Sequence, residues 1–323
     1  MTSDQSIVLA ACFNQKYVPQ AATMLRSFAD SVTTPARWYL VADDSVDQPT
    51  HDRLVDFARS RGLTAEAARI PDDLVAGFDD CGYLPRIAWY RAVLAEAFCD
   101  EDRLIYLDSD LLVLHDLRPL WEAKLRPGDY FGAIGQPSYG DAAILAAGVG
   151  LSPDTPYFNS GVMLMDLALM RAEQFARRTR EFAVSDDRPE LPTADQCAMN
   201  ALFNDRWTSL DPTWNCMSSI MLPFLFGAEW RDDRFHDAVT LERAARAPAV
   251  VHFEGPAVLK PWNARCFNPF ADLYRTYRAE TPWPLDALEG RRHDAWFARM
   301  SPRLQARVWQ FRRWQTGLSR GRS

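Results

Sequence analysis

The sequence predicts an α/β fold built around a mainly parallel sheet, and three observations support this class. Short continuous apolar runs, such as residues 7–12 (IVLAAC), are typical of strands that are buried on both faces. These runs alternate along the chain with segments of helical periodicity, which is the pattern of consecutive strand–helix–strand units. With 323 residues, of which 48% are hydrophobic and 24% charged, the chain has the composition of a globular enzyme and can bury a sizeable core.

The first third of the chain supplies these elements one after another. Residues 7–12 form the first strand, and residues 18–31 place Leu25 and Phe28 on one face of a helix. The pattern then predicts, in order, a strand at 37–44, a helix at 49–62 that Gly62 closes, a weaker strand at 63–70 and a helix at 86–98.

The later parts of the chain continue the alternation. Residues 103–117 (RLIYLDSDLLVLHDL) are predicted to form a buried strand that is interrupted by acids. Further strands are predicted at 129–135, 161–167 and 248–255, and helices at 169–183, for which Asp166 is the candidate N-cap, and at 193–203. After about residue 268 the strand signals stop and the sequence becomes aromatic and finally rich in arginine, so we expect a soft boundary there.

The overall charge and the cysteines exclude several classes of protein. The formal net charge of −7 argues against a nucleic-acid-binding protein. The six cysteines are scattered and form no Cys-x-x-Cys pair, so we expect neither a zinc ribbon nor a disulfide framework. The first residues lack the basic start of a signal peptide, and the longest apolar stretch, 220–228, is too short to span a bilayer. These features predict a cytoplasmic protein with reduced thiols.

The two acids within residues 103–117 are the most informative feature of the sequence. Asp108 and Asp110 lie between apolar runs, and burying two carboxylates close together is costly unless a cation compensates them. Because they are two positions apart in an extended segment, they point to the same side, at the kind of strand end where ligands of such sheets bind. Hard divalent cations take oxygen ligands and commonly bridge carboxylates to a phosphate. The alternative is a polar turn capped by two solvated acids.

Five segments of the chain recur in the same order in a known group of proteins. They are WYRAVLAEAF (89–98), LIYLDSDLLV (104–113), YFNSGVMLMDL (157–167), ADQCAMNALF (194–203) and VHFEGPAVLKPW (251–262). Together they resemble the retaining glycosyltransferases of family 8, which have a GT-A fold and include glycogenin-like proteins and bacterial lipopolysaccharide α-galactosyl- and α-glucosyltransferases. The resemblance covers roughly residues 5–268 and implies a GT-A catalytic domain over 1–268, followed by a C-terminal helical tail over 269–323.

The resemblance also implies roles for single residues. Asp108, Asp110 and His252 would hold Mn²⁺ or Mg²⁺ against the diphosphate of a nucleotide sugar. The other donor-binding residues would be Ala10, Asn14 and Tyr17 at the uridine, with Arg91, Ser109, Gly255 and Lys260 nearer the diphosphate and sugar. Asn159, Asp195 and Gln196 would surround the transferred sugar as the catalytic residues. Without the GPAVLKPW segment that follows it, His252 would be interpreted as a hydrogen-bonded histidine at a strand end. The alternatives for the other two are a helix-surface ion pair for Arg91, although its spacing favours donor binding, and an acid at a helix N-terminus for Asp195.

The implied reaction is the metal-dependent transfer of a hexose, glucose or galactose, from a UDP-sugar to a glycan or lipid-linked acceptor, in bacterial surface polysaccharide synthesis. Retention of configuration could come from a double displacement, with Asp195 or Gln196 as nucleophile, or from attack by the acceptor on the same face. The acceptor residues are expected on the loops within 135–156 and 211–235.

Two other functions share parts of this pattern. A phosphatase of the haloacid dehalogenase type also places Asp-x-Asp after an apolar strand, but its motif lies near the N-terminus and is usually followed by Thr or Val, whereas Leu111 follows here at mid-chain. A non-catalytic sugar- or cation-binding module would need no diphosphate-binding set such as Arg91, Gly255 and Lys260.

The end of the chain differs in charge from the rest. Residues 290–323 contain nine arginines, from Arg291 to Arg322, and one acid, Asp294. Residues 301–320 place Leu304, Val308 and Phe311 on one stripe of a predicted helix. Such a helix either docks on the domain or contacts an anionic membrane surface, which basic residues and tryptophans suit. The second alternative predicts a peripheral location at the inner face of the membrane.

Overall fold

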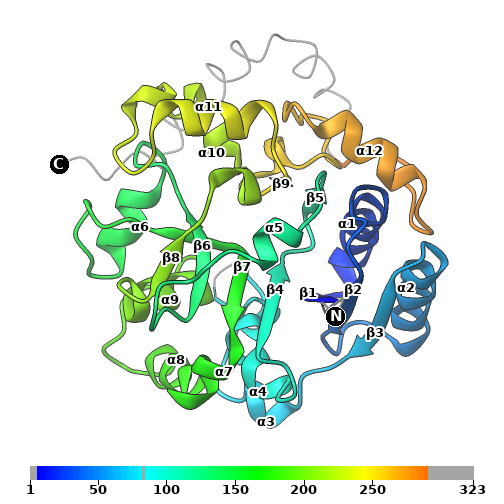
Figure 1. The fold of residues 1–323 in the computed structure, drawn as a ribbon, viewed down its shortest axis with the longest axis horizontal. Helices are drawn as coiled ribbons and strands as arrows, with labels where there is room; N and C mark the ends of the chain where they lie inside the picture. The colour runs from blue at the N-terminus through cyan, green and yellow to red at the C-terminus, as the bar shows by residue number, and fades with distance from the viewer. Residues whose placement is uncertain (1–5, 82–83, 290–323) are drawn as a thin grey trace, which may run out of the picture.

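The computed structural model describes residues 6–81 and 84–289 of the protein, and two sheets organise them (Figure 1). Seven strands form the larger sheet in the order β3-β2-β1-β4-β7-β6-β8, and the smaller sheet pairs β5 with β9. β7 runs antiparallel to β4 and β6, whereas the other neighbours in the larger sheet are parallel. The predicted α/β class with a mainly parallel sheet is therefore confirmed. The strands are β1 (Ile7–Phe13), β2 (Ala36–Ala42), β3 (Thr64–Ala68), β4 (Arg103–Leu107), β5 (Leu111–Val113), β6 (Phe131–Gly135), β7 (Phe158–Asp166), β8 (Trp207–Ser209) and β9 (Val250–His252).

Helices surround the larger sheet. The α-helices are α1 (Val18–Ser31), α2 (Gln48–Ser60), α3 (Asp72–Val75), α4 (Leu94–Ala97), α5 (Arg118–Trp121), α6 (Ala142–Gly148), α7 (Leu167–Ala172), α8 (Phe175–Ala183), α9 (Asp195–Phe203), α10 (Ser218–Met221), α11 (Ala238–Arg246) and α12 (Ala271–Ala279). The 3₁₀ helices are η1 (Gln15–Tyr17), η2 (Arg86–Val93), η3 (Pro212–Asn215), η4 (Pro223–Phe226), η5 (Trp230–Asp232) and η6 (Ala257–Leu259).

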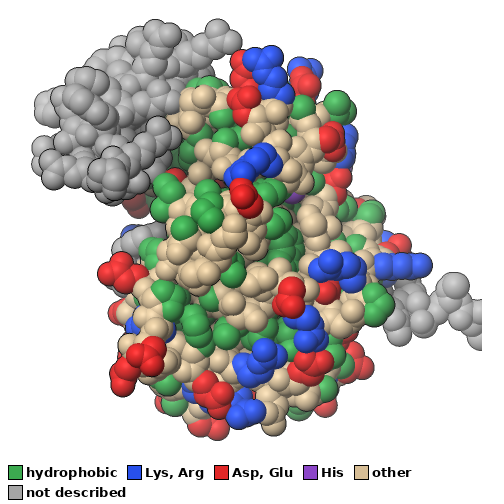
Figure 2. Space-filling model, turned by 90° about the vertical axis from the view of Figure 1, so that its left-hand side faces the viewer, with side chains coloured by type: hydrophobic (Ala, Val, Ile, Leu, Met, Phe, Trp, Pro, Cys, Tyr) green, Lys and Arg blue, Asp and Glu red, His purple; other side chains and the backbone are tan. Residues whose placement is uncertain are grey.

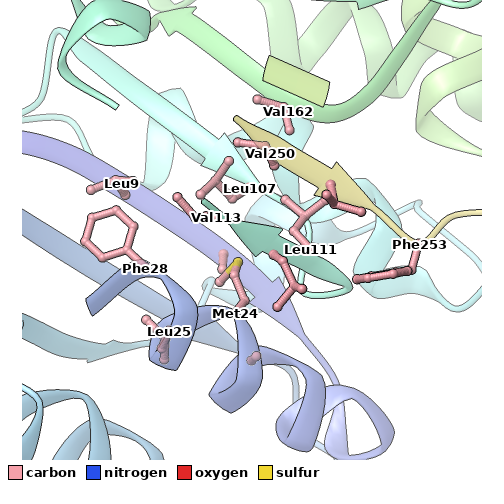
Figure 3. Packing of buried hydrophobic residues seen from close by; sticks show 14 of the residues in the cluster. Leu9, Met24, Leu25, Phe28, Leu107, Leu111, Val113, Val162, Val250 and Phe253 are labelled. Carbon is pink, nitrogen blue, oxygen red and sulfur yellow. The ribbon is translucent and has the colours of Figure 1, made fainter. Parts of the chain in front are cut away.

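The continuous apolar character of β1 is explained by burial on both of its faces. Ile7, Leu9 and the other odd positions join a core that includes α1, whereas Val8 and Ala10 join a second core with η2, α4 and α9. In the first core, Met24, Leu25 and Phe28 of α1 lie beside β1, β4 and the smaller sheet (Figure 3). The smaller sheet is thus fixed to the larger one through a shared hydrophobic core.

The connection between β4 and β5 determines where the site forms. Residues 108–110 leave the larger sheet, and β5 pairs antiparallel with β9, with Leu111 opposite His252. A backbone hydrogen bond of 3.0 Å from Phe253 N to Asp110 O continues this pairing. The sequence predicted one interrupted strand over these residues, whereas the structure divides them between two sheets. The division brings the end of β9 directly beside the two acids.

Two predicted helices are divided in the structure. The segment 86–98 begins as the 3₁₀ helix η2 before the short α4, so that Ala88, Arg91 and Leu94 follow one another at the three-residue repeat of a 3₁₀ helix. The segment 169–183 breaks at Gln174, whose φ of 56° is left-handed, into α7 and α8. Asp166 caps α7 as predicted, because its Oδ1 accepts a hydrogen bond of 2.8 Å from Leu169 N.

The last described helix, α12, packs against α1. Tyr274 of α12 is fully buried and its ring lies 5.3 Å from that of Phe253, while Arg26 of α1 pairs with Glu280 at 2.8 Å. The domain boundary at 268 stays a prediction, and the arginine-rich segment 290–323 lies outside the described residues. None of the helices in the described ranges combines the length and the apolar character that a membrane span requires.

Candidate active site

Asp108, Asp110 and His252 converge where the two sheets meet. One potential ligand atom of each lies within 4.8 Å of the others. His252 Nε2 is 3.4 Å from Asp110 Oδ1 and 3.8 Å from Asp108 Oδ2. Both acids therefore point to the same side, as predicted. Two carboxylates and an imidazole are a donor set that fits a divalent cation.

The charges around this cluster keep Asp110 ionised. Lys260 Nζ lies 2.6 Å from Asp110 Oδ2. Burial alone would raise the pKa of Asp110, but Lys260 and His252 beside it hold that pKa well below its ordinary range. Burial lowers the pKa of His252, and the neighbouring Asp110 and Asp108 outweigh this effect and raise the pKa overall.

Gly161 of β7 makes room for the imidazole of His252. A Cβ at Gly161 would lie 2.8 Å from His252 Nδ1, closer still to Cε1, and 2.9 Å from Asn159 Oδ1. The carbonyl of Gly161 also accepts a hydrogen bond of 2.8 Å from Asp108 N. The glycine in the Phe-Asn-Ser-Gly-Val segment therefore has a steric reason, which the sequence alone did not supply.

Arg91 links the cluster of Asp108, Asp110 and His252 to Asp195. Its guanidinium lies 3.1 Å from Asp108 Oδ1 and 3.0 Å from Asp195 Oδ2, and it donates to Ser160 O at 2.7 Å. Arg91 is 7% exposed, so it is a buried ion-pair partner rather than a surface residue of its helix. Since Nε donates its hydrogen bond to Ala88 O, the contact with Asp195 is ionic, and Asp195 Oδ2 accepts no hydrogen bond from the described residues.

Asp195 begins α9 in a strained and buried environment. Ala194 before it has the unfavourable backbone angles φ 45° and ψ −116°, a conformation that costs about 1–3 kcal/mol. Burial raises the pKa of Asp195 to about 7, although Arg91 acts in the opposite direction. Backbone strain and a perturbed carboxyl next to a charge partner are features of functional sites.

Asn159 and Gln196 form a hydrogen-bonded amide pair, and Gln196 follows Asp195 in the chain. Gln196 Oε1 accepts from Asn159 Nδ2 at 3.0 Å and from Ser160 N at 3.1 Å. Asn159 Oδ1 accepts from Gly161 N at 2.9 Å and from Asn215 Nδ2 at 2.8 Å. The structure thus brings Asn159 and Gln196 into contact, while the side chain of Asp195 pairs with Arg91. The sequence analysis missed Asn215, which lies outside the five recognised segments.

The segment after β9 carries Lys260, the basic side chain beside Asp110. Gly255 has a φ of 86°, a left-handed conformation that favours glycine, and the turn leads through η6 to Lys260. Lys260 Nζ lies 5.6 Å from the ring centre of Trp262, and Tyr17 packs edge-on against the same ring at 6.4 Å. Tyr17, the last residue of η1, is therefore close to the segment that carries Lys260.

The other residues predicted at the nucleotide lie along β1 and after it. Ala10 is fully buried within β1, between Tyr39 and Tyr106 of the neighbouring strands. Asn14 caps η1, since its Oδ1 accepts from Tyr17 N at 3.2 Å. Ser109 Oγ donates to Cys12 O at 3.1 Å, which ties the acidic segment to the end of β1.

The two loops that were expected to carry acceptor residues contact each other. Ser138 N donates to the Asp233 carboxylate, and Arg234 N donates to Ser138 Oγ at 3.0 Å. Tyr139 OH donates to Ser219 O at 3.1 Å. These hydrogen bonds join the segment after β6 to α10 and to the residues after η5.

Comparison with known proteins identifies relatives along most of the chain. The sequence profile of the family described as "Glycosyl transferase family 8" matches residues 8–266. The chain is 26% identical over 294 residues to General stress protein A of Bacillus subtilis, an alignment that covers 88% of this chain and 96% of that protein. It is 27% identical over 216 residues to Glycosyltransferase GlyF of Streptococcus pneumoniae and 23% identical over 207 residues to Lipopolysaccharide 1,3-galactosyltransferase of Salmonella typhimurium. These two alignments cover 67% and 62% of this chain and 47% and 56% of the relatives.

Solved structures share the fold. The galactosyltransferase LgtC, solved in complex with donor and acceptor sugar analogues, superposes with a TM-score of 0.69 at 21% identity, covering 85% of this chain and 96% of that one. The bifunctional glycosyltransferase WbbM superposes with a TM-score of 0.69 at 18% identity, covering 93% of this chain and 53% of that one. The chain therefore shares the fold of these two proteins.

Proposed function

Because the chain belongs to glycosyl transferase family 8 and is a glycosyltransferase, we propose that it transfers a hexose from a UDP-sugar to a glycan or lipid-linked acceptor. The GT-A fold and the family resemblance predicted from the sequence are confirmed, and the family decides against the phosphatase and the non-catalytic binding module. The relative named Lipopolysaccharide 1,3-galactosyltransferase supports galactose as the sugar and a surface polysaccharide as the product.

The observation that carries the proposal is the convergence of Asp108, Asp110 and His252 beside Lys260. The space that Gly161 leaves for the His252 imidazole and the buried, ionised Asp110 fit a divalent cation. For this cation we propose Mn²⁺ or Mg²⁺. When bound, such a cation supplies Lewis-acid stabilisation of the charge on a departing diphosphate. Lys260 adds a positive charge next to the same carboxylate, and Gly255 permits the turn that places it there.

Arg91, Asp195, Asn159 and Gln196 would surround the sugar. Asp195 Oδ2 pairs with Arg91 by charge and accepts no hydrogen bond from the described residues, so it retains capacity for a donor such as a sugar hydroxyl. Gln196 Oε1 already accepts two hydrogen bonds. An amide oxygen engaged in this way is a poor nucleophile, which supports same-face attack by the acceptor over a double displacement through Gln196.

The remaining parts of the proposal concern the nucleotide, the acceptor and the location. Ala10, Asn14, Tyr17 and Ser109 would bind the nucleotide at the end of β1. The joined loops around Ser138 and Asp233 would contact the acceptor. A catalytic domain over 1–268 would act at the inner face of the membrane, where the basic segment 290–323 meets anionic lipid.

A donor screen tests this proposal. The purified protein is incubated with UDP-glucose, UDP-galactose and GDP-mannose in Mn²⁺ or Mg²⁺, and the nucleoside diphosphate released is measured. We expect release of UDP from one of the UDP-hexoses, and a loss of roughly 10²-fold or more in the Asp110→Asn variant, because the metal contributes several kcal/mol to the barrier. Release from GDP-mannose alone, or equal activity of Asp110→Asn, would overturn the donor and metal assignments respectively.

A further inference from the structure

Asn215 lies between the amide pair and His252. It is fully buried at the end of η3. Its Nδ2 is 2.8 Å from Asn159 Oδ1, and its Oδ1 is 2.9 Å from His252 Nδ1. One chain of hydrogen bonds therefore runs from Gln196 through Asn159 and Asn215 to His252.

Two backbone groups fix the direction of this chain. A backbone N–H can only donate, so the side-chain atom that it meets must be an oxygen. Ser160 N meets Gln196 Oε1 at 3.1 Å, and Gly161 N meets Asn159 Oδ1 at 2.9 Å. The oxygen of the Asn159 amide therefore faces Asn215, and Asn215 must donate to it through Nδ2.

The orientation of Asn215 then determines the proton on His252. With Nδ2 directed at Asn159, the oxygen of Asn215 faces His252 Nδ1. An amide oxygen accepts, so Nδ1 must carry the hydrogen, and in the neutral imidazole Nε2 keeps its lone pair. Nε2 is the atom on the side of Asp108 and Asp110.

Asn215 and His252 are held at a fixed separation by their backbones. Cys216 N, next to Asn215, donates to Val250 O at 2.8 Å, and His252 N donates to Cys216 O at 3.1 Å. Ala249 N donates to Thr213 O at 2.9 Å within η3. The backbones that carry Asn215 and His252 therefore cannot separate without breaking the pairing between the η3 segment and β9.

We propose that Asn215 is a positioning residue that holds His252 in the Nδ1–H tautomer, with Nε2 directed at the cation. Outer partners of this kind orient ligating histidines, and their loss typically weakens metal affinity about 10- to 100-fold. The inference rests on the metal role proposed for His252, but the tautomer can be measured without turnover. The chain of amides also connects the ligand of the cation with Gln196 at the sugar.

The first experiment measures the tautomer directly. Nitrogen NMR spectra of ¹⁵N-histidine-labelled protein are recorded at a pH high enough that the imidazole shifts no longer change with pH. The His252 signals are identified by their absence in His252→Ala. We expect a proton on Nδ1 and a bare Nε2. The signal pattern of a protonated Nε2 with a bare Nδ1 would overturn the proposal.

The second experiment measures Mn²⁺ affinity in the presence of UDP by calorimetry. Asn215→Leu, which keeps the volume but offers no acceptor, should bind Mn²⁺ about 10- to 100-fold more weakly. Asn215→Asp keeps an acceptor for Nδ1–H, so it should retain the tautomer and a larger share of the affinity. Asn268→Ala is the control, because Asn268 is also buried but its Oδ1 accepts from Phe270 N outside this chain of amides.

The variants separate a positioning role from simple packing. If Asn215→Leu and Asn215→Asp lose stability as Asn268→Ala does but bind Mn²⁺ as the wild type does, Asn215 only packs and the proposal fails. If His252→Ala binds Mn²⁺ as the wild type does, the metal role of His252 fails instead, and the tautomer measurement still decides what Asn215 does. If Asn215→Leu does not fold, Asn215→Asp and the wild-type tautomer remain decisive.

Discussion

At the scale of single residues, His252 is confined on three sides. Gly161 lies next to Cε1 and Nδ1, Asn215 accepts at Nδ1, and Asp108 and Asp110 face Nε2. A histidine whose only role was a hydrogen bond at a strand end would need only one of these partners. The sequence predicted His252 and the two acids, but Gly161 and Asn215 could not be assigned roles from it, because each acts through a contact between distant segments.

Gly161→Ala should displace the imidazole. The added Cβ would lie 2.8 Å from His252 Nδ1, so we expect Mn²⁺ affinity to fall about 10-fold or more. Gly132→Ala on the neighbouring strand β6 is the control, because its Cβ would meet side-chain atoms of Leu210 at 2.9 Å, away from the cluster. Calorimetry that finds the same Mn²⁺ affinity for both variants would show that Gly161 does not shape the metal site.

Asp195 should make stability depend on pH. Burial raises its pKa from 3.8 to about 7, so its contribution to the free energy of unfolding is fully present below about pH 4 and is lost as the pH rises through 7. The unfolding free energy of the wild type minus that of Asp195→Asn should therefore fall between pH 5 and pH 8, as measured by urea unfolding. A difference that stays constant or grows over this window would contradict the shifted pKa.

At the scale of elements, the sequence predicted those helices and strands whose bounds follow from local apolar spacing. It missed the features that depend on pairing with distant parts of the chain. Helix α1 has the predicted bounds Val18–Ser31, because apolar spacing defines it. The departure of β5 toward β9 and the break at Gln174 depend on partners elsewhere in the chain, so no local signal marked them. The short β8 was also missed, since only pairing with β6 makes its three residues a strand.

The turn after β9 should be required for binding the donor. Gly255→Ala would strain a residue with φ 86° and bring Cβ to 3.3 Å from Leu259 Cδ1. Gly62→Ala is the matched control for Gly255→Ala, because Gly62 has a similar φ of 84° but no atom within 4 Å of the added Cβ. Both variants should lose about 1–2 kcal/mol of stability, but only Gly255→Ala should bind UDP more weakly in Mn²⁺. Equal UDP affinity of the two variants would exclude a specific role for this turn.

At the scale of the whole molecule, charge is unevenly distributed along the chain. The sequence contains 36 basic and 43 acidic residues, yet nine arginines gather in 290–323. On the face in Figure 2, the described residues show acidic and basic side chains interspersed with apolar ones. The proposed membrane contact is therefore assigned to segment 290–323, because its arginines suit an anionic surface.

Deleting residues 299–323 should separate catalysis from membrane contact. We expect release of UDP with water as acceptor to stay nearly unchanged, while sedimentation with anionic vesicles falls. Salt should weaken vesicle binding of the full chain, because it screens the charges of the arginines. A matched full-length variant with Arg312→Gln and Arg313→Gln should lose part of that binding. If deletion instead lowers the melting temperature markedly, the segment docks on the domain, and the membrane proposal fails.

The most direct test of the central claim is the affinity of UDP in Mn²⁺ compared with its affinity in EDTA, measured by calorimetry on the wild type. The claim is that Asp108, Asp110 and His252 hold the cation through which the diphosphate is bound. It predicts that the wild type binds UDP at least about 10-fold more tightly in Mn²⁺ than in EDTA. Asp110→Asn should lose most of this difference. Equal affinity in Mn²⁺ and in EDTA would contradict the claim.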